Sequence, residues 1–227
     1  MILRVPRLLD GPTLARIREM LDRASWSDGR ITAGSQSAQV KNTLQLREDS
    51  VEAESARAIV LDALSRNGLF FSAALPRRIF PPLFNRYEGR HNAFGNHVDN
   101  AVRRIQGTRE SLRTDVSATL FLSDPESYDG GELVVEDTFG THSIKLPAGD
   151  VVLYPASSLH RVEPVTRGAR IASFFWIESM VRDDARRRLL FDLDVSIMSI
   201  RDKHGETAEA VRLTACYHNL LRMWAEP

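Results

Sequence analysis

Between residues 76 and 178 the chain alternates apolar and polar residues with a period near two, and this pattern restricts its fold more than any other feature. Over 116–122, Val, Ala and Leu alternate with Ser, Thr and Phe. Similar short runs follow at 132–137, 141–146, 149–155 and 169–179. Short strands at intervals of about ten residues, without helical crossovers between them, predict an antiparallel sandwich or barrel rather than a parallel sheet.

The segment before this region has a helical rhythm. Asp10 followed by Pro12 is typical of a helix start, and leucine and isoleucine then recur on one face. A second periodic run over 50–68 is expected to end at Gly68, because glycine favours the conformation that terminates a helix. Residues 25–45 have no clear helical period and predict a loop with one strand.

The segment after the region is helical again. Apolar residues recur at helical spacing over 181–202 and 207–225, on either side of the break KHGE, which predicts an αα-hairpin. The hairpin has more apolar residues than one stripe requires, so it either packs on the barrel or forms a homodimer interface. We therefore expect a mainly β protein with flanking helices (α+β). Its parts would be an N-terminal helical support at 1–75, a β core at 76–178 and a helical hairpin at 179–227.

Composition excludes several classes of protein. The 227 residues contain 30 Lys and Arg against 30 Asp and Glu, and this zero net charge argues against a nucleic-acid partner. The single cysteine, Cys216, excludes an internal disulfide or a multi-thiolate zinc site, and we expect it to be a buried, inert thiol. The first residues, MILRVPRLLDGP, do not have the pattern expected of a secretory signal, and the longest apolar stretch, 169–177, is too short to span a bilayer. A cytoplasmic protein without membrane association is expected.

Three residues in the β region have the types and spacing of a metal site. His97 and Asp99 are two residues apart, so in an extended chain their side chains leave the same face. His160 follows a strand 63 residues later, at the position of a barrel rim. Two imidazoles and one carboxylate with open positions form the facial triad of non-haem Fe(II) oxygenases, whereas hydrolytic zinc is the competing interpretation. A surface loop would explain the His-x-Asp triplet equally well.

Arg170 begins the last strand of the region and shares a face with Ala172, Phe174 and Trp176. If that face is inward, the guanidinium requires an anionic partner, and no acidic residue lies within the apolar run 169–177. A bidentate ligand carboxylate would meet this requirement. The alternative is an arginine at the rim with a surface partner.

These residues lie in longer segments that are similar to a known family. The segments FNRYEGRHNAFGNHVD, SATLFLSDPESYDGGELVVED and PAGDVVLYPASSLHRVEPVTRGARIASFFWIES resemble the Fe(II)/2-oxoglutarate-dependent dioxygenases of the prolyl-4-hydroxylase-like branch. Along nearly its whole length the chain resembles the bacterial PKHD-type (PiuC-like) hydroxylases. The resemblance implies a double-stranded β-helix, a jelly-roll or cupin-like barrel.

The resemblance also implies roles for particular residues. His97, Asp99 and His160 would be catalytic and would hold Fe(2+), and Arg170 would bind the distal carboxylate of 2-oxoglutarate. Tyr87 would either hydrogen-bond to this cosubstrate or be a core aromatic residue. The implied reaction uses O2 to hydroxylate an unactivated C–H bond of a small-molecule or peptidyl substrate, with release of succinate and CO2. L-ascorbate would assist, and the reaction would be associated with bacterial iron uptake.

Two other functions share the same residues. A cupin-like zinc hydrolase would use the three ligands but leave Arg170 unexplained, and a non-catalytic metal or 2-oxoglutarate sensor would bind without turnover. The remaining histidines are not assigned to the metal; they are His91, His142, His204 and His218. Of these, His142 is expected to face a core, because it alternates with isoleucine and leucine. Gly130 and Gly131 are expected to serve a turn.

Overall fold

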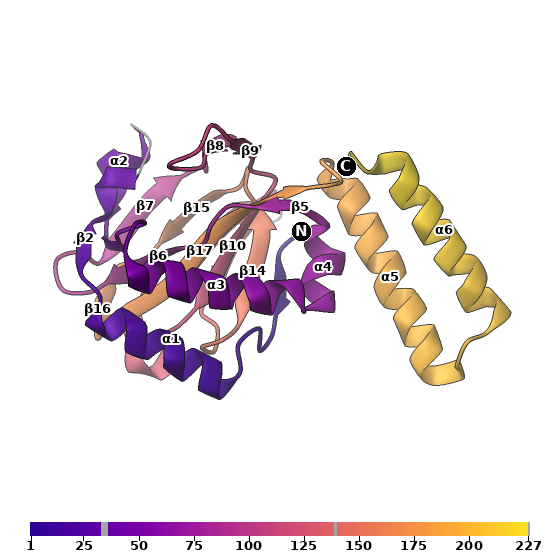
Figure 1. Ribbon diagram of the computed structural model, residues 1–227, viewed down its shortest axis with the longest axis horizontal. Coiled ribbons are helices and arrows are strands. Elements are labelled where there is room, and N and C mark those ends of the chain that lie inside the picture. The colour runs from indigo at the N-terminus through magenta and orange to yellow at the C-terminus, as the bar shows by residue number, and fades with distance from the viewer. Residues whose placement is uncertain (33–35, 139, 227) are drawn as a thin grey trace.

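The computed structural model describes residues 1–32, 36–138 and 140–226, and its core is formed by two antiparallel sheets (Figure 1). The larger sheet has the strand order β1-β14-β10-β17-β6-β4-β2, and β5 also pairs with β17. Its strands are β1 (Leu3–Val5), β2 (Trp26–Asp28), β4 (Leu44–Leu46), β5 (Pro76–Ile79), β6 (Leu83–Tyr87), β10 (Val116–Phe121), β14 (Val151–Pro155) and β17 (Arg170–Ser179).

The smaller sheet has the order β13-β12-β15-β7-β3. Its strands are β3 (Lys41–Asn42), β7 (Ala93–His97), β12 (Leu133–Asp137), β13 (Gly140–Ile144) and β15 (Leu159–Val162). Two short ribbons complete the strands: β8 (Val102–Arg104) with β9 (Ser111–Arg113), and β11 (Asp129–Gly130) with β16 (Val165–Arg167). Every pairing between described strands is antiparallel, so the predicted mainly β jelly-roll is confirmed.

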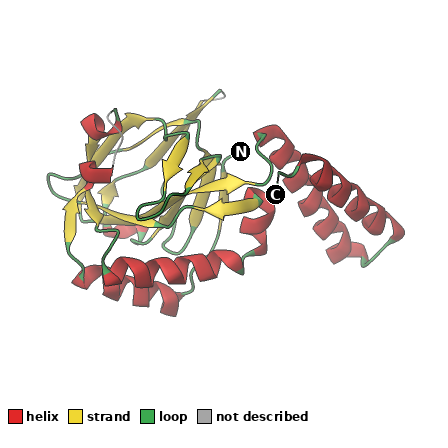
Figure 2. Cartoon of the chain, turned by 45° about the horizontal axis from the view of Figure 1, so that its top comes forward, coloured by secondary structure: helices red, strands yellow, loops and turns green. Residues whose placement is uncertain are grey.

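Two helices, α1 (Gly11–Arg23) and α3 (Val51–Ser65), run side by side across the outer face of the larger sheet (Figures 1 and 2). Asp10 caps α1 by accepting a 2.9 Å hydrogen bond from the Thr13 amide, as the sequence predicts. Both helices bury one apolar face against the outward side chains of β10 and β17. Burial of this apolar surface fixes the larger sheet and leaves its opposite face for the interior between the sheets.

Two expectations for the N-terminal part are wrong. Gly68 does not end a helix; it begins α4 (Gly68–Ala74), because the Asn67 side chain accepts a hydrogen bond from the Phe70 amide and caps the new helix. In the described part of the segment 25–45, β2, β3, the start of β4, a 3₁₀ turn (Gly29–Thr32) and α2 (Ser37–Val40) replace the expected loop with one strand. These strands have only two or three residues, too few to show a period.

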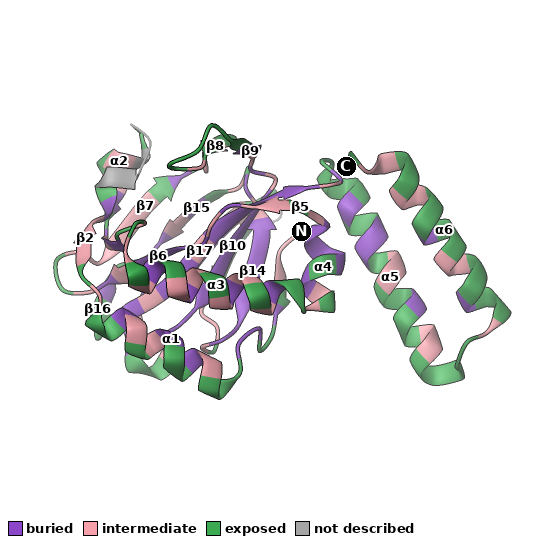
Figure 3. Ribbon diagram, in the orientation of Figure 1, coloured by how far each residue is buried: buried purple, intermediate pink, exposed green. Residues whose placement is uncertain are grey.

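The C-terminal helices α5 (Asp184–His204) and α6 (Ala208–Trp224) form the predicted hairpin, which extends away from the barrel (Figure 1). Its helices pack on each other, and Ser72 of α4 anchors it by donating a 2.6 Å hydrogen bond to Asp194. Much of its outer surface is exposed (Figure 3). Cys216 is exposed on this surface, so the expectation of a buried thiol is wrong. Within the described residues, no helix combines the length and apolar character needed to cross a membrane.

Candidate metal centre

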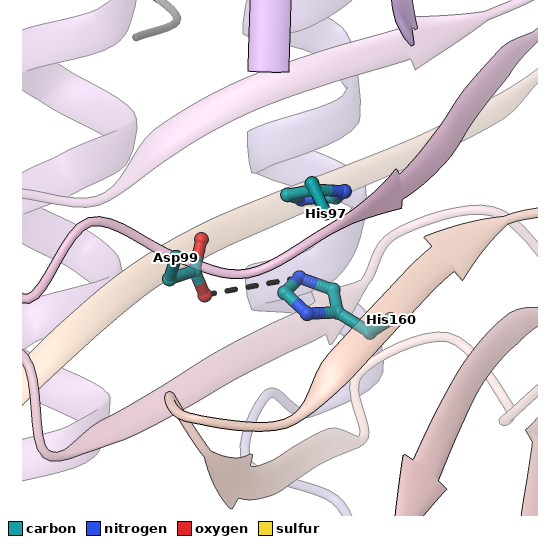
Figure 4. A group of neighbouring side chains, drawn as sticks. All are labelled: His97, Asp99 and His160. Atoms are coloured by element: carbon teal, nitrogen blue, oxygen red, sulfur yellow. Dashed lines mark ion pairs between the residues drawn. The ribbon is translucent and has the colours of Figure 1, made fainter. Parts of the chain in front are cut away.

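His97, Asp99 and His160 converge at one end of the space between the two sheets (Figure 4). His97 is the last residue of β7, and His160 lies opposite it on β15 in the strand register. Asp99 follows two residues after His97, where the chain leaves the strand. One potential ligand atom from each residue lies within 4.8 Å of the others, and Nε2 of His160 is 3.7 Å from Oδ2 of Asp99.

Backbone carbonyls fix the orientation of both imidazoles. Nδ1 of His97 lies 2.8 Å from the Gly95 carbonyl oxygen, and Nδ1 of His160 lies 3.0 Å from that of Ser158. Because a carbonyl oxygen only accepts, each Nδ1 must donate, and in a neutral ring of this tautomer Nε2 is the nitrogen with the lone pair. This is the arrangement by which proteins prepare histidine to bind a metal.

The surroundings of His97 keep its imidazole neutral. Its side chain is buried and its ring stacks on Phe94, with ring centroids 3.6 Å apart. Burial, with a smaller contribution from the nearby His160, lowers the pKa of His97 to about 4. Near neutral pH the ring therefore carries no competing proton on the nitrogen that faces the cluster.

Ser117 holds the carboxylate of the cluster. Its hydroxyl donates a 2.6 Å hydrogen bond to Oδ2 of Asp99, and the serine side chain is buried on β10. The sequence analysis missed this role, although the alternation of β10 places Ser117 on the face opposite Ala118 and Leu120. That alternation is a usable signal, because a serine on the inward face of a buried strand requires a partner.

Arg170 lies in the interior of the barrel. Its side chain is 1% exposed, and its guanidinium carbon lies 5.1 Å from the ring centre of Tyr87 and 5.3 Å from that of Phe121. Among the described residues, Nε and Nη2 of Arg170 have no hydrogen-bond partner. The structure therefore excludes the alternative of a rim arginine with a surface partner. A buried cation with unpaired N–H groups indicates a site for an anion.

Two tyrosines and an asparagine surround this guanidinium. Tyr87 lies opposite Arg170 in the register of β6 and β17, and its hydroxyl accepts a 3.0 Å hydrogen bond from Nδ2 of Asn85. Burial raises the pKa of Tyr87 to about 12, so its phenol remains a donor. The hydroxyl of Tyr128, which the sequence analysis did not single out, has no partner among the described residues.

Gly131 lies next to the aliphatic part of the Arg170 side chain. Its φ of +69° suits a turn, as expected, but a Cβ there would also lie 3.0 Å from Cδ of Arg170 and 3.1 Å from Cε2 of Tyr128. The sequence predicts the turn and gives no sign of this contact, because the contact joins residues far apart in the chain. The absence of a side chain at 131 thus leaves room for Arg170.

One cavity joins the two groups of residues. It is lined by the His-Asp-His cluster, by Arg170 and Tyr87, and by apolar side chains that include Leu133 and Val162. Two further cations line it, Lys41 and Arg103, neither of which the sequence analysis identified. Neither is apparent from the sequence, because each lies on a strand of only two or three residues and outside the His-x-Asp triplet.

The other histidines lie outside the metal cluster. His142 is exposed and lies 3.0 Å from an Asp137 carboxylate oxygen, so the expectation that it faces a core is wrong. His204 ends α5, and His218 is exposed on α6. Among the described residues, the set at 97, 99 and 160 is the one group of this kind with converging ligand atoms.

The donor atoms suit a particular kind of ion. Two imidazole nitrogens and one carboxylate leave coordination positions open, which is the arrangement of non-haem Fe(II) oxygenases and also of some catalytic zinc sites. A zinc site by itself would give no partner to Arg170. A chelating 2-oxo acid would satisfy both features, with one end on the metal and a carboxylate at the other end on the guanidinium.

Comparison with known proteins identifies relatives in sequence and in fold. Residues 82–178 match the 2OG-Fe(II) oxygenase superfamily, and residues 184–226 match the PKHD-type hydroxylase C-terminal domain. The chain is 63% identical over 228 residues to a PKHD-type hydroxylase of Xanthomonas campestris pv. campestris, and 58% identical over 227 residues to one of Burkholderia thailandensis, with 100% of each chain covered. A prolyl-4-hydroxylase structure from Pseudomonas putida has a similar fold, with 17% identity, a TM-score of 0.53 and coverage of 78% of this chain and 92% of that one.

Proposed function

Because this chain belongs to the PKHD-type hydroxylases of the 2OG-Fe(II) oxygenase superfamily, we propose that it hydroxylates an unactivated C–H bond of a small-molecule or peptidyl substrate. The cosubstrate is 2-oxoglutarate, which leaves as succinate and CO2. The observation that carries this proposal is the pairing of an open His-Asp-His cluster with a buried, unpartnered arginine in one cavity.

In this proposal Fe(2+) is held by Nε2 of His97, Nε2 of His160 and a carboxylate oxygen of Asp99. The carbonyls of Gly95 and Ser158 hold the imidazoles with the Nε2 lone pairs available. When bound, the iron supplies the oxidative chemistry with O2 and 2-oxoglutarate. The three side chains would hold the iron and would leave coordination positions open.

The same cavity would also bind 2-oxoglutarate. Arg170 would bind its distal carboxylate through the Nε and Nη2 groups that lack protein partners. The Tyr87 hydroxyl, which accepts from Asn85 and still has a proton to donate, would add a hydrogen bond. Leu133 and Val162 line the same cavity and exclude water around the cosubstrate.

An anaerobic titration tests the proposal. The protein is loaded with Fe(II), 2-oxoglutarate is added, and we expect weak visible absorption near about 500 nm from the chelated 2-oxo acid. Exposure to O2 should bleach the absorption and yield succinate. Asp99→Ala should fold but bind iron poorly and give no absorption, because the carboxylate ligand is gone.

Other outcomes would favour the alternative functions. Tight zinc binding with hydrolytic activity, and neither absorption nor succinate, would favour a zinc hydrolase. Tight binding of 2-oxoglutarate without succinate formation with any substrate would favour a sensor. Full activity of Asp99→Ala would contradict the assignment of the metal ligands.

The proposal also includes a reductant, a cellular compartment and a link to iron uptake. L-ascorbate would restore iron after turnover without substrate, the enzyme would act in the cytoplasm, and the reaction would be linked to bacterial iron uptake. Expression that rises when iron is withheld would support this link, and unchanged expression would contradict it. Residues 76–178 would form the catalytic core. Residues 1–75 would support it with helices and also contribute β1, β2, β3 and β4 to the two sheets, and 179–227 would form a hairpin at a homodimer interface.

A further inference from the structure

Arg103 is a second cation in the active-site cavity, and the proposed reaction does not use it. It lies on β8, four residues after Asp99, and its side chain lines the cavity that contains the metal cluster. Among the described residues, no carboxylate lies within ion-pair distance of Arg103, and its Nε has no hydrogen-bond partner. Asp99, whose negative charge acts on it, is instead hydrogen-bonded to Ser117.

Aromatic rings hold this guanidinium in place. Its central carbon lies 3.9 Å from the ring centre of Trp176 and 5.2 Å from that of Phe80. The two rings pack edge to face, with centroids 5.4 Å apart. A cation–π contact occupies the flat face of the guanidinium. The edge of the group, where the N–H groups lie, remains available to hydrogen-bond to a planar anion.

Lys41 adds positive charge to the same part of the cavity. Its ammonium lies 5.5 Å from the ring centre of Phe174 and 5.6 Å from that of Phe94, and it donates a hydrogen bond to the Gln45 side chain. Burial and the neighbouring charge of Arg103 lower the pKa of Lys41 to about 8. Two cations that repel each other within one partly apolar cavity favour the arrival of an anion.

Arg103 and Arg170 differ in position. Arg170 is 1% exposed between the sheets, whereas Arg103 is partly exposed on the β8–β9 ribbon at the rim of the barrel. Arg170 would be occupied by 2-oxoglutarate during the proposed reaction. Arg103 is therefore the cation that remains for the second reactant, and this step rests on the proposed function.

We propose that the substrate is a small carboxylic acid, that Arg103 binds its carboxylate with Lys41 providing additional positive charge, and that its apolar part lies against Phe174 and Trp176. A carboxylate matches the planar fork of a stacked guanidinium in shape and charge. The aromatic rings next to this fork suit a hydrocarbon portion. An uncharged analogue would leave the guanidinium without its anion and would bind weakly.

The test uses Zn(II)-loaded, ¹⁵N-labelled protein saturated with 2-oxoglutarate, so that the site at Arg170 is filled and no turnover occurs. Phenylacetate, hexanoate and N-acetylglycinate are titrated, each beside its uncharged primary amide. The chain has three tryptophans, and the indole N–H signal of Trp176 is assigned with Trp176→Phe. We expect at least one acid to shift the Trp176 signal saturably, the matching amide to have little effect, and the signals of Trp26 and Trp224 to stay unchanged.

Acid binding is then compared between variants of two neighbouring arginines, Arg103 and Arg104. Arg103→Gln should weaken acid binding by about tenfold or more, because a charge-assisted pair is lost. Arg104→Gln makes the same charge change at an exposed position of the same strand and should leave binding unchanged. If Arg103→Gln does not fold, Arg103→Lys takes its place, and it should also bind less tightly because a lysine lacks the planar fork.

Four results would contradict the proposal: no acid shifts the Trp176 signal, amides bind as tightly as acids, the Arg103 variant binds as the wild type does, or the Arg104 variant loses binding equally. Binding of 2-oxoglutarate to the wild type is measured separately by calorimetry. Failure of that binding would contradict the proposed function, whereas the contrast between the arginine variants would still decide the role of Arg103.

Discussion

The hydroxyl of Ser117 donates a 2.6 Å hydrogen bond to Oδ2 of Asp99, so a strand of the larger sheet positions a proposed metal ligand at the end of a strand of the smaller sheet. The bond fixes the position of one carboxylate oxygen of Asp99. It thereby couples the alignment of the two sheets to the geometry of the metal cluster.

Ser117→Ala should weaken Fe(II) binding by about 10- to 100-fold, because partners that orient metal ligands typically contribute that much. Ser173→Ala is the matched control, since Ser173 is equally buried on the adjacent strand β17 and its hydroxyl has no partner among the described residues. Anaerobic competition with a chromophoric chelator measures both affinities. Equal affinities for the two variants would show that the hydrogen bond does not position the ligand.

Arg170→Met should stabilise the ligand-free protein while removing its response to 2-oxoglutarate. A buried, unpaired charge costs several kcal/mol, so an apolar side chain of similar length should raise the free energy of unfolding by about 1 kcal/mol or more. 2-Oxoglutarate should bind about 10- to 100-fold more weakly. Arg167→Met, at an exposed ion pair with Asp129, should change neither quantity much. Denaturant unfolding and calorimetry provide the measurements, and unchanged 2-oxoglutarate affinity would remove Arg170 from the site.

The metal-free protein should lose stability as the pH falls from about 6.5 toward about 4. His97 has a pKa of about 4 in the folded protein against an ordinary value of 6.5, so over this window the unfolded chain binds the additional proton. Its contribution to stability is complete above pH 6.5 and is lost on approach to pH 4. In His97→Asn the melting temperature should depend less steeply on pH across this window. An identical pH dependence in the variant and the wild type would contradict the depressed pKa.

Gly131→Ala should impair both stability and 2-oxoglutarate binding. The added Cβ would lie 2.8 Å from Cγ2 of Val165 and 3.0 Å from Cδ of Arg170, and the φ of +69° disfavours alanine. Gly107→Ala separates these effects, because Gly107 has a φ of +76° with open space around it. Each variant should lose about 1–2 kcal/mol from backbone strain, but only Gly131→Ala should raise the KM for 2-oxoglutarate. A normal KM in that variant would show that Arg170 tolerates the crowding.

The elements with a clear period were predictable, and those without one were not. The alternation over 116–122 and the cap at Asp10 led directly to β10 and α1. The helix that begins at Gly68 was missed because a glycine after a periodic run favours an end, and only the Asn67 cap reverses that preference. The exposed positions of Cys216 and His142 were also missed, since composition and alternation do not state which face of an element lacks a neighbour.

The reactive groups of this protein are recognisable from its residues alone: the His-x-Asp triplet, a distant histidine, one arginine on an alternating strand, and segments similar to a known family. Which groups share a cavity follows from the packing of the two sheets. Ser117, Tyr128, Lys41 and Arg103 belong to the site through strand pairing and sheet packing across long separations in the chain. Local periodicity fixes which side of a strand a residue occupies, but contact between two sheets depends on the registers of every strand between them.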